Sequence, residues 1–156
     1  MDLRVEDVIL RKVVTIDSES TVEEATEKMH SSFTSSLVVL SGKKIVGFLS
    51  TRDIVSNIVA NGLDPKKVMV NEVMTSPVIM MRPDTPLGEA IKIMLQKKIK
   101  KLPIVEGDRD KARLVGLFSI TDMVEYHPYI FSILWEEILM TVPAVPEEGE
   151  FNLVHA

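Results

Sequence analysis

Two short segments with the same residue pattern carry the side chains best suited to chemistry in this chain. They are GFLSTRDIV, residues 47–55, and GLFSITDMV, residues 116–124. In each, a glycine and two apolar residues lead to a serine, and an aspartate follows three residues later. Serine and aspartate at this spacing are typical of a capping box at a helix start, with Ser50 and Ser119 as caps and Asp53 and Asp122 as third helical residues.

The same motif can also bind a ligand. A helix N-terminus presents unpaired N–H groups and the positive end of the helix dipole, which favour a phosphate. A carboxylate in the first helical turn can accept hydrogen bonds from two adjacent sugar hydroxyls. Spacing alone favours the capping box. If the two units are related by a two-fold axis, however, both copies of the motif would face one shared cleft. That arrangement favours a binding site for a ribose phosphate over a capping role alone.

The two motifs belong to a longer internal repeat. A shift of 65 residues aligns Val5 with Val70, and a shift of 69 residues aligns Gly47 with Gly116. The change of shift falls in a turn, which is SGKK in the first copy and the longer EGDRDKA in the second. An insertion costs little in a hairpin loop, so both copies are expected to have one fold.

Each copy has the same predicted order of elements: strand, helix, strand, strand, helix. The first helix is predicted to start at Ser20 in one copy and at Thr85-Pro86 in the other, and a short linking helix to start at Asp64-Pro65. Each unit is marginal alone, so we expect an α/β (α+β) fold in which two β-α-β-β-α units pack as a pseudo-two-fold pair. The predicted strands are residues 13–16, 37–40 and 45–49, then 78–81, 102–105 and 114–118.

Composition bounds the class of protein. The chain has 156 residues, is 46% hydrophobic and 26% charged, and carries a net charge of −5, which is typical of a globular protein. The absence of cysteine excludes disulfides, thiolate metal sites and cysteine nucleophiles. We see neither a signal peptide nor a membrane-spanning run, and expect a cytoplasmic protein. The three histidines are scattered along the sequence, and the chain has neither a P-loop nor a dinucleotide-type glycine loop. We therefore expect neither an enzyme nor a metal site.

The chain resembles a tandem pair of CBS domains, often called a Bateman module. The resemblance lies in the order of three segments, residues 5–55, 70–105 and 114–124. The family's fold is a β-α-β-β-α unit, and paired units associate through their sheets. The resemblance implies a stand-alone regulatory module that binds adenosine-containing ligands in two clefts and acts on a partner protein. AMP, ADP or ATP is the expected regulatory ligand, S-adenosylmethionine or NAD is the alternative, and no cofactor is required.

The resemblance also assigns candidate site residues. Asp53 and Asp122 would hold ribose hydroxyls, Ser50 and Ser119 the sugar or phosphate, and the residues before each aspartate would face phosphate. The ribose and phosphate set is Ser50, Thr51, Arg52, Asp53, Ser119, Ile120, Thr121, Asp122, Lys100 and Lys101. The adenine set is Val13, Val14, Thr15, Leu37, Val38, Val78, Ile79, Met80, Leu102 and Pro103, about half of which also fit an ordinary core.

The one dense basic cluster is KKIKK, residues 97–101. A nucleic-acid patch is disfavoured, because the cluster lacks aromatic neighbours and the chain is acidic. A solvated helix end is an ordinary alternative. The resemblance instead implies that Lys100 and Lys101 reach phosphate, whereas the matching Ser35 and Ser36 are neutral. Two unequal clefts are therefore expected, and one would be rich in phosphate ligands if Arg52 and Lys101 faced the same cleft.

The predicted division of the chain is residues 1–62 for the first CBS unit, 63–127 for a linker helix and the second unit, and 128–156 for a terminal helix and a loose acidic end. The segment Tyr129–Met140 is apolar at helical spacing, and Pro128 can start its helix. Packing on its own module is slightly favoured over a dimer or partner contact. The family commonly forms homodimers, so a homodimer is expected. A ligand-free interaction protein of this fold is the second hypothesis.

Overall fold

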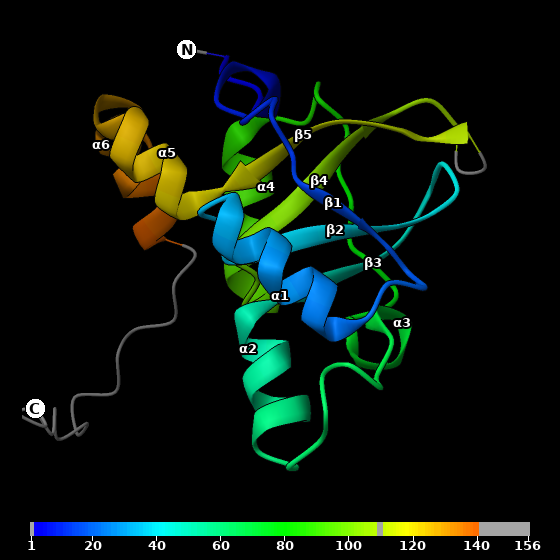
Figure 1. Ribbon diagram of the computed structural model, residues 1–156. Coiled ribbons are helices and arrows are strands. Elements are labelled where there is room, and N and C mark those ends of the chain that lie inside the picture. Colours follow the sequence, from blue (N-terminus) through cyan, green and yellow to red (C-terminus); the bar gives the residue numbers. More distant parts are fainter. Residues whose placement is uncertain (1, 109–110, 141–156) are drawn as a thin grey trace, which may run out of the picture.

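The computed structural model describes residues 2–108 and 111–140, and only the backbone at residues 137 and 138. Both copies of the repeat contain a helix followed by an antiparallel hairpin and a second helix (Figure 1). The first unit comprises β1 (Thr15–Asp17), α1 (Val22–Ser31), β2 (Ser36–Ser41), β3 (Lys44–Ser50) and α2 (Thr51–Ile54), which continues as the π-helical turn η2 (Val55–Val59). The second comprises α4 (Leu87–Lys97), β4 (Lys101–Glu106), β5 (Arg113–Ser119) and α5 (Ile120–Tyr126).

Three further helices lie outside the two hairpin units. They are the 3₁₀ helix η1 (Val5–Asp7), α3 (Val70–Val73) and α6 (Pro128–Leu139). The short linking helix is therefore α3, and the prediction that it starts at Asp64-Pro65 was wrong. Asp64 instead closes a turn, in which its Oδ1 accepts a hydrogen bond from the Lys66 N–H at 3.0 Å.

The two sheets differ in their first strand. In the first unit β1 runs parallel to β2, which pairs antiparallel with β3. In the second unit β4 and β5 form a two-stranded sheet, and of the predicted strand at residues 78–81 only Met81 makes a bridge, to Ile104. The Val38 N–H donates to Val14 O at 3.1 Å, but the matching residue is Pro103, which has no N–H to donate. The proline therefore shortens the pairing.

The N-terminal caps of α1 and α4 each lie one residue away from the predicted position. The N-cap of α1 is Thr21 rather than Ser20: Thr21 Oγ1 accepts from the Glu24 N–H at 3.1 Å, and Glu24 Oε2 accepts from the Thr21 N–H at 2.9 Å. This is a complete capping box. Pro86 precedes α4 as its cap residue and is not its first helical residue.

The segments that precede the two units are exchanged between them. Val5 donates its N–H to Thr85 O at 3.0 Å in the second unit, and Val70 donates its N–H to Ser20 O at 2.8 Å in the first. Farther along, Leu10 and Leu117 exchange two backbone hydrogen bonds, of 3.0 and 2.8 Å, and so do Thr75 and Phe48. Because each pair maps onto the other by the repeat, the contacts define a pseudo-two-fold relation between the units.

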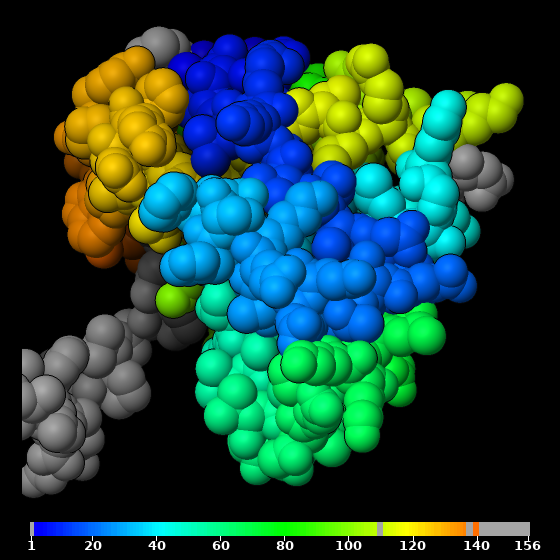
Figure 2. Space-filling model, in the orientation of Figure 1, coloured from blue at the N-terminus to red at the C-terminus, as the bar shows by residue number. Residues whose placement is uncertain are grey.

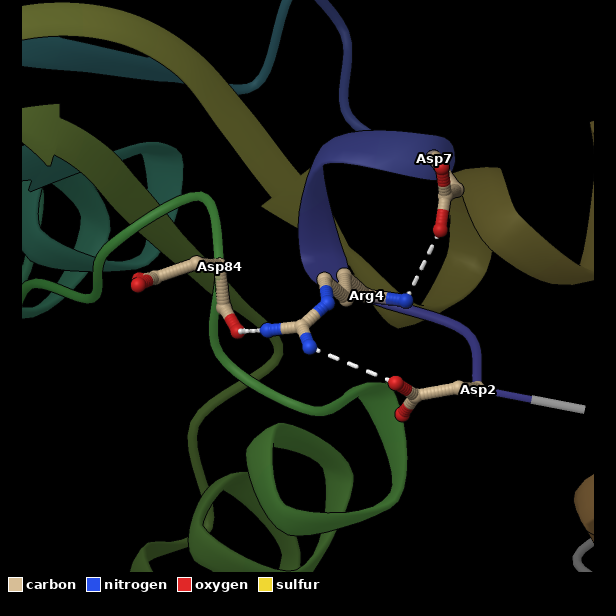
Figure 3. A network of polar contacts seen from close by, with 4 residues as sticks. All are labelled: Asp2, Arg4, Asp7 and Asp84. Atoms are coloured by element: carbon tan, nitrogen blue, oxygen red, sulfur yellow. Dashed lines mark hydrogen bonds and ion pairs between the residues drawn. The ribbon is translucent and has the colours of Figure 1, made fainter.

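Arg4 fastens the N-terminal segment to the second unit (Figure 3). Its Nη1 donates to Asp84 O at 2.7 Å, and its Nη2 lies 3.3 Å from Asp2 Oδ2. The Arg4 N–H donates to Asp7 Oδ2 at 2.8 Å, which caps η1. Although it begins the predicted first unit at residues 1–62, this segment packs against the second unit.

Three apolar clusters hold the fold together. The first-unit core includes Leu37 and Leu49, the second-unit core includes Leu102 and Phe118, and a smaller cluster around Val38 joins the two sheets. The second-unit core also contains Val5 and Val8 from the exchanged segment, in agreement with the backbone contacts. Burial between units therefore provides what a single unit of this size lacks.

Helix α6 packs on its own module, as the favoured prediction stated. Ile130 and Leu134 are buried in the second-unit core, and α6 lies against α4 and α5 (Figure 1). Tyr129, Ile133 and Leu139 are each at least half exposed. The side chain of Ile138 and the predicted loose acidic end lie outside the described residues. Among described helices, none is both long and apolar enough to cross a bilayer.

Candidate functional site

The second motif starts α5 and leaves its carboxylate unused. Ser119 is buried and caps the helix, with its Oγ accepting from the Asp122 N–H at 3.3 Å. The Asp122 carboxylate is half-buried and accepts no hydrogen bond from any residue that the structure describes. A carboxylate with free acceptor positions at this depth can bind donors from a ligand.

The first motif forms a closed arrangement instead. Asp53 Oδ2 accepts from the Ser50 N–H at 2.9 Å and from the Ser50 hydroxyl at 3.0 Å, and Asp53 Oδ1 accepts from the Thr75 hydroxyl at 3.4 Å. The Asp53 N–H in turn donates to Ser50 Oγ at 3.3 Å. The two aspartates therefore share a position in the repeat but differ in their availability. Within the described part of the chain, the bond from Thr75 has no counterpart at Asp122 because Leu10 is the matching residue, and Ser119 donates no bond to Asp122 as Ser50 does to Asp53.

Asp122 lines a cavity of about 690 Å³ between the two units. One wall is aliphatic and comes from the first unit, and the opposite side comes from α5 and from β5 at Leu117. The volume lies within the roughly 300–1,000 Å³ typical of small-molecule sites. Of the predicted site residues, five line this cavity: Val13, Val14, Val38, Lys101 and Asp122.

Polar groups surround the rest of the cavity. The segment from the end of α1 to the start of β2 contributes five hydroxyl residues, and Lys12 and Lys101 add positive charge. The hydroxyl residues are Ser31, Ser32, Thr34, Ser35 and Ser36. Lys101 Nζ donates to Ser35 Oγ at 3.2 Å across the two units. Ser36 Oγ is buried and has no hydrogen-bond partner among the described residues. Because a buried hydroxyl without a partner is unfavourable, Ser36 points to a ligand that would supply one.

The remaining predicted site residues lie elsewhere. Thr51 and Arg52 are exposed in the first turn of α2 and do not line the Asp122 cavity, so Arg52 and Lys101 do not share it. Thr15, in β1, is half-buried, as is Val78. Leu37, Leu102 and Pro103 are buried in the strands, whereas Ile79 and Met80 are exposed. Ile120 and Thr121 begin α5. The Ile120 N–H donates to the backbone oxygen of Lys100 at 3.1 Å, and Lys100 is exposed.

The sequence did not predict several residues of the cavity. Phe33 lies in the hydroxyl-rich loop, Lys12 precedes the aliphatic wall, and Tyr126 lies one helical turn after Asp122. The spacing from Asp122 to Tyr126 places both on one face of α5, so that signal was readable. Phe33 carries no periodic signal, because it stands in a loop between two elements.

The cavity combines an aliphatic slot, one free carboxylate, two lysines and several hydroxyls. These groups match a ligand with an apolar ring, a diol and a phosphate. They do not form a metal site: among the described residues, no group of three or more His, Cys, Asp or Glu side chains is placed to hold an ion.

The sequence model of the CBS domain matches residues 5–60 and 70–129, and the chain therefore belongs to the CBS domain family. The two matches make it a CBS-domain pair.

Similar proteins include both short CBS proteins and longer enzymes. The CBS domain-containing protein YhcV of Bacillus subtilis is 30% identical over 119 residues, which cover 76% of this chain and 81% of YhcV. An uncharacterized protein of Methanopyrus kandleri is 32% identical, with 85% of this chain and 66% of that protein covered. The inosine-5'-monophosphate dehydrogenase of Korarchaeum cryptofilum is 36% identical, but the match covers 81% of this chain and only 25% of the enzyme. This chain thus spans most of YhcV, but only 66% of the Methanopyrus protein and 25% of the dehydrogenase.

Solved structures have the same fold. An uncharacterized conserved protein from Pyrococcus horikoshii is 28% identical with a TM-score of 0.71, covering 81% of this chain and 92% of that one. The hexameric CBS-CP12 protein from bloom-forming cyanobacteria is 26% identical with a TM-score of 0.73, covering 83% of this chain and 71% of that one. The predicted fold class is confirmed.

Proposed function

We propose that this chain is a regulatory module that binds an adenine nucleotide in the Asp122 cavity and transmits its occupancy to a partner protein. The observation that carries the proposal is the free Asp122 carboxylate in a cavity between the two units. AMP, ADP and ATP are the favoured ligands. The chain acts as a cytoplasmic sensor and not as an enzyme.

Each part of the nucleotide has a matching group in the cavity. The adenine lies against the aliphatic wall of Val13, Val14 and Val38, and Asp122 accepts hydrogen bonds from the ribose hydroxyls. Lys101 binds phosphate as a point charge. The Ser36 hydroxyl makes the hydrogen bond that it lacks within the described protein.

Binding would be coupled to the arrangement of the units, because the cavity takes its walls from both. A ligand can shift only an equilibrium between states that it binds with different affinity. A nucleotide held by Val13 on one side and Asp122 on the other favours the closed pairing of the units. The outer surface of that pair is then the signal that a partner reads.

The main alternative is a CBS-fold interaction protein whose cavity has no ligand. Ser36 argues against it, because an empty cavity would leave its buried hydroxyl without a partner, whereas the Asp122 carboxylate would be paired with water alone. S-adenosylmethionine would make the same ribose contact but has no phosphate, so Lys12 and Lys101 favour a phosphate-bearing ligand over it. NAD carries a diphosphate, and thermal unfolding against a panel of ligands distinguishes it from AMP, ADP and ATP. A nucleic-acid role for residues 97–101 is disfavoured by the net charge of −5.

Thermal unfolding against AMP, ADP, ATP, S-adenosylmethionine and NAD tests the proposal. A ligand at about 100 times its dissociation constant adds roughly 2.7 kcal/mol to the free energy of unfolding. In a protein of this size, that raises Tm by about 5–10 °C. A matched variant, Ser36→Ala, removes the buried hydroxyl and should lower the response while leaving a folded protein. An unchanged Tm across the whole panel would contradict the proposal.

We also propose a homodimer that uses the exposed side of α6. Tyr129, Ile133 and Leu139 are exposed there, and an apolar surface of this kind favours burial against a second copy. Sedimentation velocity of Ile133→Glu, with Val59→Glu on η2 as a control at an exposed apolar residue outside α6, measures the effect. The Ile133 variant should be monomeric, and a parent chain that is itself monomeric would refute the dimer.

A further inference from the structure

Phe33 is an aromatic residue in an unfavourable position at the edge of the Asp122 cavity. Its side chain is 97% exposed, and its φ of 52° lies in the left-handed region that most side chains avoid. It is also one of the residues that line the cavity. An exposed phenyl ring in a left-handed backbone conformation gains nothing from the fold as it stands.

The backbone conformation at this position belongs to the repeat, but the aromatic ring does not. In the first unit the Thr34 N–H donates to Met29 O at 3.1 Å, and in the second the Ile99 N–H donates to Met94 O at 2.9 Å. Both helices thus end in the same way, with a left-handed residue that is Phe33 in one unit and Lys98, with φ of 56°, in the other. Glycine and asparagine suit such an end best. The helix end therefore does not explain a phenylalanine.

The neighbourhood of Phe33 explains it better. The loop that carries Phe33 lies beside α5, where the light-blue surface meets the yellow surface in Figure 2. The cavity thus has an aliphatic wall at Val13 and Val14, the Asp122 carboxylate on α5, and the phenyl ring at an exposed edge. Aromatic side chains stack on nucleobases, and stacking covers apolar surface on both partners.

We propose that Phe33 stacks on the base of the bound nucleotide from the solvent side and holds it against the aliphatic wall. The ring makes the site selective for a ligand with a base over a sugar phosphate alone. This inference rests on the proposed function, since it assigns a specificity-determining residue of the same cavity.

The test compares Phe33→Gly and Phe33→Trp, with Lys98→Gly as the matched control at the equivalent position. Glycine adopts the left-handed conformation readily, so Phe33→Gly keeps the fold and its Tm should not fall. Calorimetric titration then measures affinity for the tightest of AMP, ADP and ATP, and competition measures affinity for ribose 5-phosphate. Because a base–aromatic stack is worth about 1–3 kcal/mol on alanine substitution, Phe33→Gly should bind the nucleotide roughly 5–150-fold more weakly.

The other expected results separate stacking from a structural role. Phe33→Trp and Lys98→Gly should bind the nucleotide as the parent does, and Phe33→Gly should bind ribose 5-phosphate unchanged. The parent should quench the fluorescence of the etheno derivative of the same nucleotide more strongly than Phe33→Gly does, whether or not ribose 5-phosphate binds.

Different failures have different meanings. If Phe33→Gly binds the nucleotide like the parent, or quenches the etheno derivative equally, Phe33 does not stack and the proposed function survives. Equal losses for nucleotide and ribose 5-phosphate would show that the loop, not the ring, matters, and would overturn the inference. A parent that binds no nucleotide overturns the proposed function and this inference together.

Discussion

Asp53 and Asp122 have the same place in the repeat but different hydrogen-bond partners. Asp53 accepts from Ser50 and Thr75, whereas the Asp122 carboxylate has no partner among the described residues. A ribose at Asp53 would have to replace those hydrogen bonds, but a ribose at Asp122 would replace only water. At the scale of single residues, the two aspartates therefore differ in their availability, which agrees with the expectation that a ligand uses Asp122 in preference to Asp53.

Alanine at each aspartate should give opposite results. Asp122→Ala should abolish the nucleotide-dependent rise in Tm and leave the Tm of the free protein nearly unchanged. Asp53→Ala should keep the nucleotide response but lose about 1 kcal/mol of stability, which lowers Tm by about 2–4 °C. Differential scanning fluorimetry with and without nucleotide measures both. A reversed pattern would place the ligand at Asp53 instead.

Helix starts are the features of single elements that the sequence predicted best. The Ser-x-x-Asp motifs do begin α2 and α5. For α1 the same chemistry applies one residue later: Ser20 and Glu23 also have the capping-box spacing, but Thr21 and Glu24 make the two hydrogen bonds. Capping is a local interaction, so the sequence identifies it to within a residue.

Thr21→Ala and Ser20→Ala distinguish the two candidate caps of α1. Thr21→Ala should lower the free energy of unfolding by about 1 kcal/mol, because the Glu24 N–H loses its acceptor. Ser20→Ala should stay within about 0.5 kcal/mol of the parent. Urea unfolding monitored by far-UV circular dichroism measures both values. A larger loss for Ser20→Ala would mean that the helix starts at the earlier residue.

The exchange of segments is a property of the whole molecule and gives the two echoed glycines different roles. A Cβ at Gly116 would lie 2.9 Å from Leu10 O and 2.7 Å from Ile9 Cδ1, in the segment that comes from the first unit's sequence. The three atoms nearest to a Cβ at Gly47 all belong to the side chain of Met74. Backbone cannot move aside as a flexible thioether can.

Gly116→Ala should therefore be more harmful than Gly47→Ala. Overpacking against the Leu10 backbone should cost roughly 1–3 kcal/mol and displace the N-terminal segment from β5. Gly47→Ala should cost less, since Met74 can change rotamer. Urea unfolding gives the two stabilities, and hydrogen exchange at the Leu10 and Leu117 amides reports the displacement. Equal losses for the two variants would contradict the difference between the contacts.

Local patterns in the sequence determined the repeat, the hairpins, the capped motifs and the helix that starts at Pro128. Periodicity and capping depend on residues a few positions apart, so they can be read from one sequence. The expected strand at residues 78–81 failed for a reason that lies across the sheet, where Pro103 has no N–H to donate. That reason becomes visible only when the strand register is known.

The tertiary structure alone decided which aspartate faces an open cavity, which lysine shares that cavity and which loop covers it. Lys101 meets Ser35, and Asp122 lies across from Val13, only because the two units pack with their leading segments exchanged. Phe33 gained significance in the same way, since its neighbours come from distant parts of the chain. Contacts of long sequence separation are set by packing of the whole molecule, and the sequence of either unit alone contains no pattern that specifies them.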